Sequence, residues 1–139
     1  MKSIKPLLCI ILALLLGSCH SEEQAPCENL VCTQEFRTIT MKFTDTNGDP
    51  LLVKDFKSIN LRTNKELSST NNDATIFTKG VYIVASDINL RDLSNEGDHI
   101  KISATNPTNG TLKVADFVVS GGTCNCHVSK ISGPEIISF

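Results

Sequence analysis

The sequence is poor in aromatic side chains and in long apolar runs. It has no tryptophan and only one tyrosine, so the exposed rings on which sugar-binding surfaces stack their ligands are scarce. Its 13 basic residues are outnumbered by 15 acidic ones and form no conspicuous run, which argues against a nucleic-acid partner. The most apolar stretch, residues 7–16, is shorter than the roughly 20 residues of a membrane-spanning helix.

Motifs for catalysis are also missing. The sequence contains no Gly-x-Ser-x-Gly elbow for a nucleophilic serine. His20 lies in a polar N-terminal segment, His99 at the polar start of a predicted strand, and His127 on the outward face of the last predicted strand. The acidic residues at 92, 96 and 98 are interpreted as a solvated loop. We therefore expect no catalytic residues and no enzyme activity.

The N-terminus has the features of an export signal. Lys2 and Lys5 precede the apolar residues 7–16, and small residues follow. The end of this segment, Leu16-Gly17-Ser18-Cys19, resembles the lipobox of bacterial lipoproteins. The resemblance implies that the chain is cut before Cys19, that a diacylglycerol is attached to its thiol, and that the new amino terminus is acylated. The membrane is then the first expected partner.

A short polar tether follows the expected anchor. The sequence His20-Ser21-Glu22-Glu23 resembles the export signal of surface lipoproteins in the Bacteroidetes, and residues 21–26 also have the composition of a flexible linker. We expect an outer-membrane lipoprotein of the bacterial cell envelope, facing either the periplasm or the cell surface. The expected division is a signal peptide at 1–18, lipidated cysteine and tether at 19–31, and one folded domain at 32–139.

Four cysteines remain after the signal and the anchor: Cys27, Cys32, Cys124 and Cys126. An even number in an exported chain predicts two disulfides. A bridge between Cys124 and Cys126, two residues apart, would close a strained ring. We therefore expect Cys27 and Cys32 each to pair with one of the two later cysteines, and the sequence leaves open which pairs with which.

Metal binding is the alternative role for these cysteines, and it makes a more specific claim about function. The segment Cys124-Asn125-Cys126-His127 offers soft ligands at close spacing, and the two earlier cysteines could complete a four-thiolate site. That site requires reduced thiols, whereas an oxidising compartment favours disulfides. Elsewhere, residues 45–49 begin like a calcium loop, but Pro50 stands where glycine is expected. We expect a turn there, and no metal or cofactor.

The alternation of apolar and polar residues predicts about seven short strands. The clearest is residues 36–44, with Ile39, Met41 and Phe43 on the inward face. The other predicted strands are residues 58–62 with Ile59 and Leu61 inward, 74–77, 81–85 as a central strand, 99–105, 111–119 with a bulge near Asp116, and 124–131. Residues 87–95 suit one helical turn. The pattern predicts an all-β domain, a single Greek-key β-sandwich.

Two resemblances narrow this prediction. The block from Ile39 to Leu51, with the later strand at 80–84, is similar to carboxypeptidase regulatory-like domains, which implies a transthyretin-like sandwich; an immunoglobulin-like one is the alternative. Residues 32–37, together with Cys126-His127-Val128 and Ser132-Gly133, resemble a group of small Bacteroidetes lipoproteins. Neither resemblance supplies catalytic residues, and a shared fold does not carry a function.

The expected function is a non-catalytic lipoprotein of the cell envelope that acts as a binding or structural module. Its further partner would be a protein or a glycan. The sequence also allows a metal-binding lipoprotein that uses Cys124 and Cys126. A third hypothesis is an inhibitor of a secreted enzyme, in which the polar residues 65–73 would form the inhibitory loop.

Overall fold

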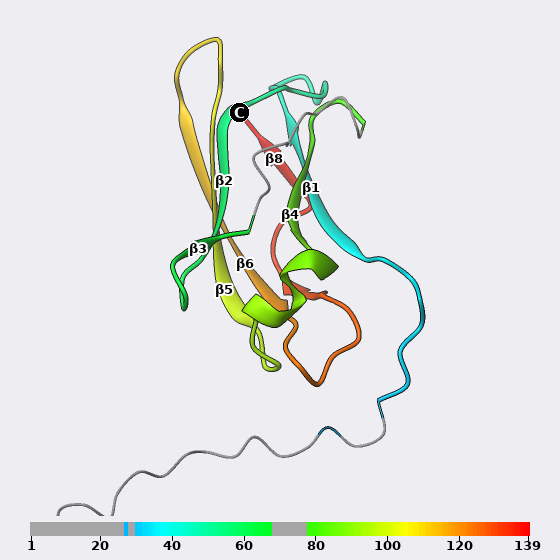
Figure 1. The fold of residues 1–139 in the computed structure, drawn as a ribbon. Coiled ribbons are helices and arrows are strands. Elements are labelled where there is room, and N and C mark those ends of the chain that lie inside the picture. Colours follow the sequence, from blue (N-terminus) through cyan, green and yellow to red (C-terminus); the bar gives the residue numbers. More distant parts are fainter. Residues whose placement is uncertain (1–26, 28–29, 68–77) are drawn as a thin grey trace, which may run out of the picture.

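The computed structural model describes Cys27 and residues 30–67 and 78–139. These residues form a two-layered β-sandwich with one short 3-10 helix, η1 (Figure 1), so the predicted all-β class is confirmed. The elements are β1 Thr38–Thr44, β2 Lys54–Asn60, β3 Lys65–Glu66, β4 Val81–Ser86, η1 Asp87–Asp92, β5 Asp98–Thr105, β6 Leu112–Ser120, β7 Ser129–Ser132 and β8 Ile136–Ser138. The expected signal peptide, Cys19 and the strand predicted at 74–77 lie outside the described residues.

The two sheets are unequal in size. One has the strand order β4-β1-β8 and the other the order β3-β2-β5-β6-β7. The β5–β6 ladder is the longest and runs without a register shift from the Asp98–Val119 pair to the Thr105–Leu112 pair. Strand β8 lies parallel to β1, with Ile136 beside Lys42. Segments that are early and late in the chain therefore share a sheet.

The core lies between the two sheets, and the predicted alternation places it correctly on β1 and β5. Ile39, Met41 and Phe43 are buried on β1, as expected, and Ile100 and Ile102 are buried on β5. The ring of Phe43 packs edge-on against Tyr82, with ring centroids 5.4 Å apart. Burying a side chain of this size contributes about 1.5–3 kcal/mol, so these strands hold the two sheets together.

The inward face of β2 was predicted wrongly. Ser58 and Asn60 are buried, whereas Ile59 is only partly buried and Leu61 is exposed. The buried polar groups are stable there because they have partners in the core. The Ser58 hydroxyl donates to the carbonyl of Val84 at 2.6 Å. Phe56 and Asn60, two residues before and after Ser58, lie on the same face of the strand and are partly buried and buried, respectively.

Three further predictions about strands need correction. Strand β4 is not central, because among the described residues it pairs only with β1. The β5–β6 ladder has no bulge near Asp116, and β6 keeps its alternation there because Val114 lies on the exposed face. The register of β6 shifts instead between Val118 and Val119, where it pairs with β7. The last predicted strand is a loop over residues 124–128, followed by the short strands β7 and β8.

The helical turn predicted at 87–95 is present as η1. Its Leu90 packs against the core and Leu93, which ends the helix, is buried. Within the described residues, no helix has the length and apolar character that a membrane crossing requires.

Candidate functional site

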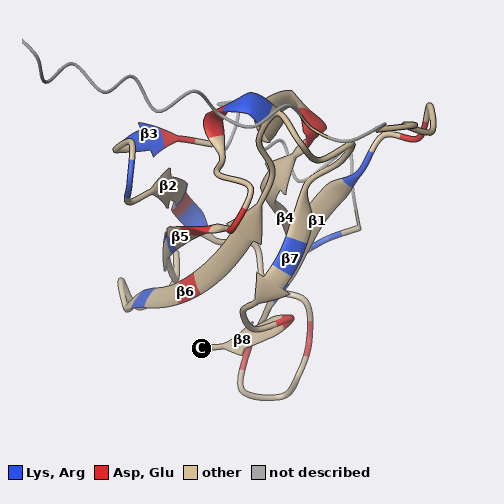
Figure 2. Ribbon diagram, turned by 90° about the horizontal axis from the view of Figure 1, so that it is seen from below, with Lys and Arg blue, Asp and Glu red and all other residues tan. Residues whose placement is uncertain are grey.

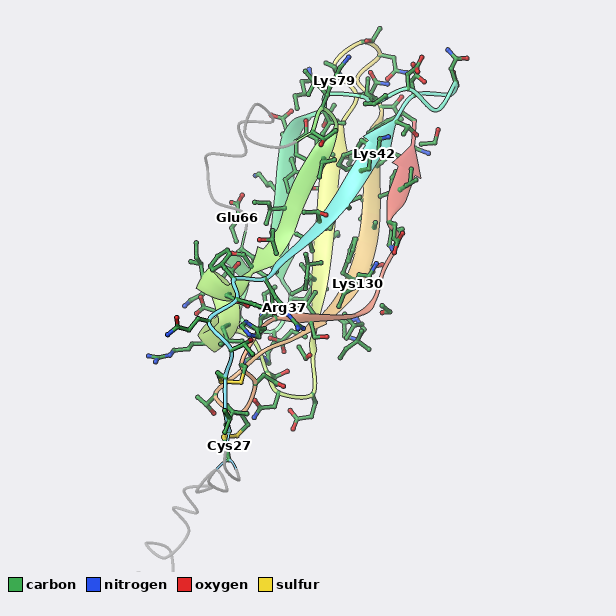
Figure 3. All side chains as sticks on the ribbon, turned by 90° about the vertical axis from the view of Figure 1, so that its right-hand side faces the viewer. Cys27, Arg37, Lys42, Glu66, Lys79 and Lys130 are labelled. Carbon is green, nitrogen blue, oxygen red and sulfur yellow. A yellow bond between two sulfur atoms is a disulfide. The ribbon has the colours of Figure 1, made fainter. Side chains whose placement is uncertain are left out.

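Two disulfides join the segment before β1 to the loop between β6 and β7. The bridges are Cys27–Cys124 and Cys32–Cys126, each with Cα atoms 5.2 Å apart. The favoured pairing is therefore confirmed, and the structure supplies the partner of each cysteine. Both bridges lie at the end of the sandwich that carries η1 (Figures 1 and 3). We call this region the disulfide-linked end. All four sulfurs are in disulfides, so the thiolates that the metal hypothesis needs are not formed.

Asp87, the first residue of η1, connects three segments at this end. Its carboxylate accepts the backbone N–H of Arg37 at 2.8 Å, the backbone N–H of Val128 at 2.8 Å, and Nδ1 of His127 at 2.7 Å. Burial alone would raise the pKa of Asp87, but these hydrogen bonds outweigh it and lower the pKa below its ordinary value. The carboxylate thus holds the N-terminal segment and the disulfide loop against the helix.

His127 was placed wrongly by the sequence analysis. It lies in the disulfide loop and not on a strand, and its side chain is only 10% exposed. Because a carboxylate can only accept, Nδ1 carries the proton that is donated to Asp87. The other ring nitrogen, Nε2, lies 3.1 Å from the hydroxyl of Thr33. His99, by contrast, is exposed on β5, as expected.

The order Thr33–His127–Asp87 has the connectivity of a hydroxyl nucleophile, a base and an orienting acid. A catalytic site also needs room for a substrate beside the hydroxyl. Two depressions at this end, which are described below, are lined by described residues other than Thr33 and His127. The hydrogen bonds of these three residues fix the N-terminal segment to the disulfide loop and to η1, and we call the three residues the clamp.

The sequence holds only a weak signal for this clamp. Thr33 directly follows Cys32, and His127 directly follows Cys126. Once the Cys32–Cys126 bridge is known, it brings these two neighbours together. Asp87 lies 40 residues from His127 and shares no motif with it.

A second buried acid, Asp98, lies behind the same end. Its side chain is 3% exposed and receives the guanidinium of Arg62 through Nε at 2.6 Å and Nη2 at 2.8 Å. It also accepts Nδ2 of Asn60 at 2.7 Å and the backbone N–H of Ser94 at 3.2 Å. Desolvation would raise the pKa of Asp98, but the hydrogen bonds outweigh it and lower the pKa to about 2. The interpretation of Asp98 as part of a solvated loop was therefore wrong.

Two adjoining depressions open between η1 and the disulfide loop. They have volumes of about 600 Å³ and about 380 Å³ and share Arg91, Gly122 and Thr123. Arg62 lines the larger one, and Leu30 lines the smaller one. Arg91 is exposed and has no ion-pair partner among the described residues. The surface here combines guanidinium groups with apolar side chains.

Glycines allow the disulfide loop to approach η1 closely. A Cβ atom on Gly121 would lie 2.7 Å from the carbonyl of Leu90 and 2.8 Å from Cβ of Leu93. The backbone N–H groups of Gly121 and Gly122 donate to the carbonyls of Ser94 and Leu90. A larger residue at Gly121 would therefore collide with the carbonyl of Leu90 and the side chain of Leu93.

Other candidate sites from the sequence are not assembled. Asp45 is used inside its own turn, where its carboxylate accepts the backbone N–H groups of Asn47 and Asp49 at 2.8 and 3.0 Å. This supports a turn over a calcium loop. Across the described residues, no group of three or more His, Cys, Asp and Glu is placed to hold a metal ion. Most of the inhibitory loop proposed at 65–73 lies outside the described residues.

Comparison with known proteins gives no relative: no protein-family model, no curated protein and no solved structure matches this chain. A function for it must therefore come from its own sequence and geometry.

Proposed function

We propose that the protein is a lipid-anchored protein of the cell envelope that acts as a non-catalytic binding or structural module. The observation that supports this most is the double covalent tie at the disulfide-linked end. Only eight residues after Cys19, the chain is joined through Cys27 to the loop that follows β6. A lipid on Cys19 would then hold a cross-linked domain close to the membrane.

The chemistry of this end supports a module without catalysis. The carboxylates of Asp87 and Asp98 are both occupied by hydrogen bonds from the chain itself. Among the described residues that line the two depressions at this end, Thr33 does not appear. These groups fix backbone segments, which is the work of a scaffold. Its partner beyond the membrane would be a protein or a glycan.

The anchor is tested by producing the full chain in a bacterium and separating its membranes. We expect the wild-type protein in the outer-membrane fraction, with an intact mass that includes a diacylglycerol and an added acyl chain. Cys19→Ala should lose the lipid mass and leave the membrane. Cys9→Ala, the matched change inside the expected signal peptide, should keep both. A Cys19→Ala protein that remains equally membrane-bound would contradict the anchor.

The absence of catalysis has its own test. The purified domain should hydrolyse a panel of p-nitrophenyl esters no faster than its Thr33→Val and His127→Gln variants do. Turnover that disappears in both variants, with their folding intact, would show that the clamp is an active site and would overturn this part of the proposal.

A further inference from the structure

The disulfide-linked end exposes apolar side chains that the core does not use. Val31 is 91% exposed, Ile88 80%, Phe36 64% and Leu30 45%. Leu30 and Val31 lie between the two cysteines of the N-terminal segment, and Ile88 lies on η1. Exposed apolar groups that gather at one place mark an interaction surface, whereas single scattered ones do not.

Hydrogen bonds and a shared depression show that these four residues belong to one end. The backbone of Arg37 exchanges two hydrogen bonds with Asp87. Phe36, which precedes Arg37, and Ile88, which follows Asp87, therefore lie beside the same pair of hydrogen bonds. Leu30 lines the smaller depression together with Arg91 of η1 and with the Cys32–Cys126 bridge. We call Leu30, Val31, Phe36 and Ile88 the apolar end.

We propose that the apolar end is a membrane-contact surface, which lies in the headgroup region of the bilayer that holds the anchor. The inference rests on the lipid anchor proposed above. It adds which part of the domain meets the lipid and with which side chains.

The length of the tether supports a lipid partner. Cys27 follows Cys19 by eight positions, and a fully extended chain over that interval spans at most about 29 Å. Cys27 is fixed at the disulfide-linked end (Figure 3), so this end is the part of the domain nearest to an anchored lipid. The turn between β5 and β6 lies at the opposite end, about 30 Å away along the strands.

The side chains at this end also suit a headgroup layer. Apolar side chains beside cationic ones are typical of surfaces that lie in the membrane interface. Arg91, which has no ion-pair partner among the described residues, can pair with a lipid phosphate through its planar guanidinium. Basic and acidic residues are both present along the ribbon in the view from this end (Figure 2).

Such a contact is weak by itself and depends on the anchor. Four exposed side chains are few for a stable membrane association of a free protein. The tether makes the second contact intramolecular and so raises the local concentration of lipid at the apolar end. A soluble domain without the lipid should therefore not bind vesicles, whereas the anchored domain should contact the vesicle surface through the apolar end.

The natural absence of tryptophan provides the experiment. The full lipidated chain is made with Ile88→Trp, with Val31→Trp, or with Leu112→Trp as the matched control, because Leu112 is 61% exposed at the opposite end. Each is reconstituted in vesicles of phosphatidylethanolamine, phosphatidylglycerol and a brominated phosphatidylcholine. We expect the bromine to quench the fluorescence of the Ile88→Trp and Val31→Trp proteins at least two-fold, and that of Leu112→Trp hardly at all.

Flotation of the same samples separates the two proposals. If the proteins do not float with the vesicles, the anchor fails and the contact surface fails with it. If they float and no variant is quenched, or all three are quenched equally, the anchor stands and the membrane-contact surface is refuted. The apolar end would then be open to a protein partner. Val31→Trp guards against misfolding of the Ile88→Trp variant, since the two residues lie on different segments.

Discussion

Replacing Asp98 by asparagine tests whether the buried acid behind the disulfide-linked end stabilises the fold through its charge. Asp98→Asn keeps the shape of the side chain but places an amide N–H₂ where a carboxylate oxygen now receives Arg62. The amide of Asn60, which is fully buried, loses a charged acceptor at 2.7 Å. A buried donor with a weakened partner costs about 1–3 kcal/mol, so we expect a loss of about 2 kcal/mol at pH 7.

The dependence of this loss on pH follows from the pKa. The folded protein holds the pKa of Asp98 at about 2, below its ordinary value of 3.8, because Arg62 and its neighbours favour the charged form. A lowered pKa stabilises the fold at all pH values above 3.8, and the stabilisation is lost as the pH falls through about 2. The difference corresponds to about 2 kcal/mol, allowing for the partial exposure of Arg62.

The assay is urea unfolding of the wild type and the variant, with both disulfides intact, at pH 7, 5, 4, 3 and 2. The difference in the free energy of unfolding between the two proteins should stay constant from pH 7 to 5 and shrink towards pH 2. Asp116→Asn, at an exposed position on β6, is the control and should change stability by less than about 0.5 kcal/mol. A difference for Asp98→Asn that is the same at pH 2 and pH 7 would refute the charged hydrogen bonds.

Two further predictions concern the clamp and the bridges. Asp87→Ala removes the acceptor of two backbone N–H groups and of His127, so it should lower the free energy of unfolding by about 3 kcal/mol. Thr33→Val, at the exposed end of these hydrogen bonds, should lower it by less than about 1 kcal/mol. Both are measured by thermal unfolding. Replacing Cys32 and Cys126 by serine opens only the small ring between the two bridges and should lower the free energy of unfolding by about 2–3 kcal/mol. Removing the Cys27–Cys124 bridge as well should lower it by about 4–5 kcal/mol more. Equal losses in the two steps would contradict this order.

The parts of the fold that follow from the sequence are those in which burial and polarity alternate. On β1 and β5 one face meets the core and the other meets solvent, so Met41 and Ile102 could be placed from the pattern alone. The disulfide pairing was limited to two possibilities by the spacing of the cysteines, and only the positions of the two segments in space decide between them.

The predictions failed where polar groups are buried with distant partners. Ser58 and Asn60 look like the solvent face of a strand, but their partners, Val84 and Asp98, lie 26 and 38 residues away. His127 was predicted to be exposed for the same reason, since no residue near it in the sequence indicates that its partner is Asp87. A local pattern records hydrophobicity and not hydrogen bonds between remote segments, so the candidate site was the least predictable part of the chain.

The parallel pairing of β1 with β8 has a consequence for how the chain folds. Lys42 and Ile136, which are neighbours in the sheet, are 94 residues apart in the sequence, and the disulfides span 97 and 94 residues. Contacts between segments so far apart in the sequence form slowly, because the long loop must close before they are gained. When the chain emerges from a ribosome, β1 has no neighbour on its β8 side until that strand has followed it. Completion of this sheet is therefore a late step of folding, which waits for the synthesis of β8.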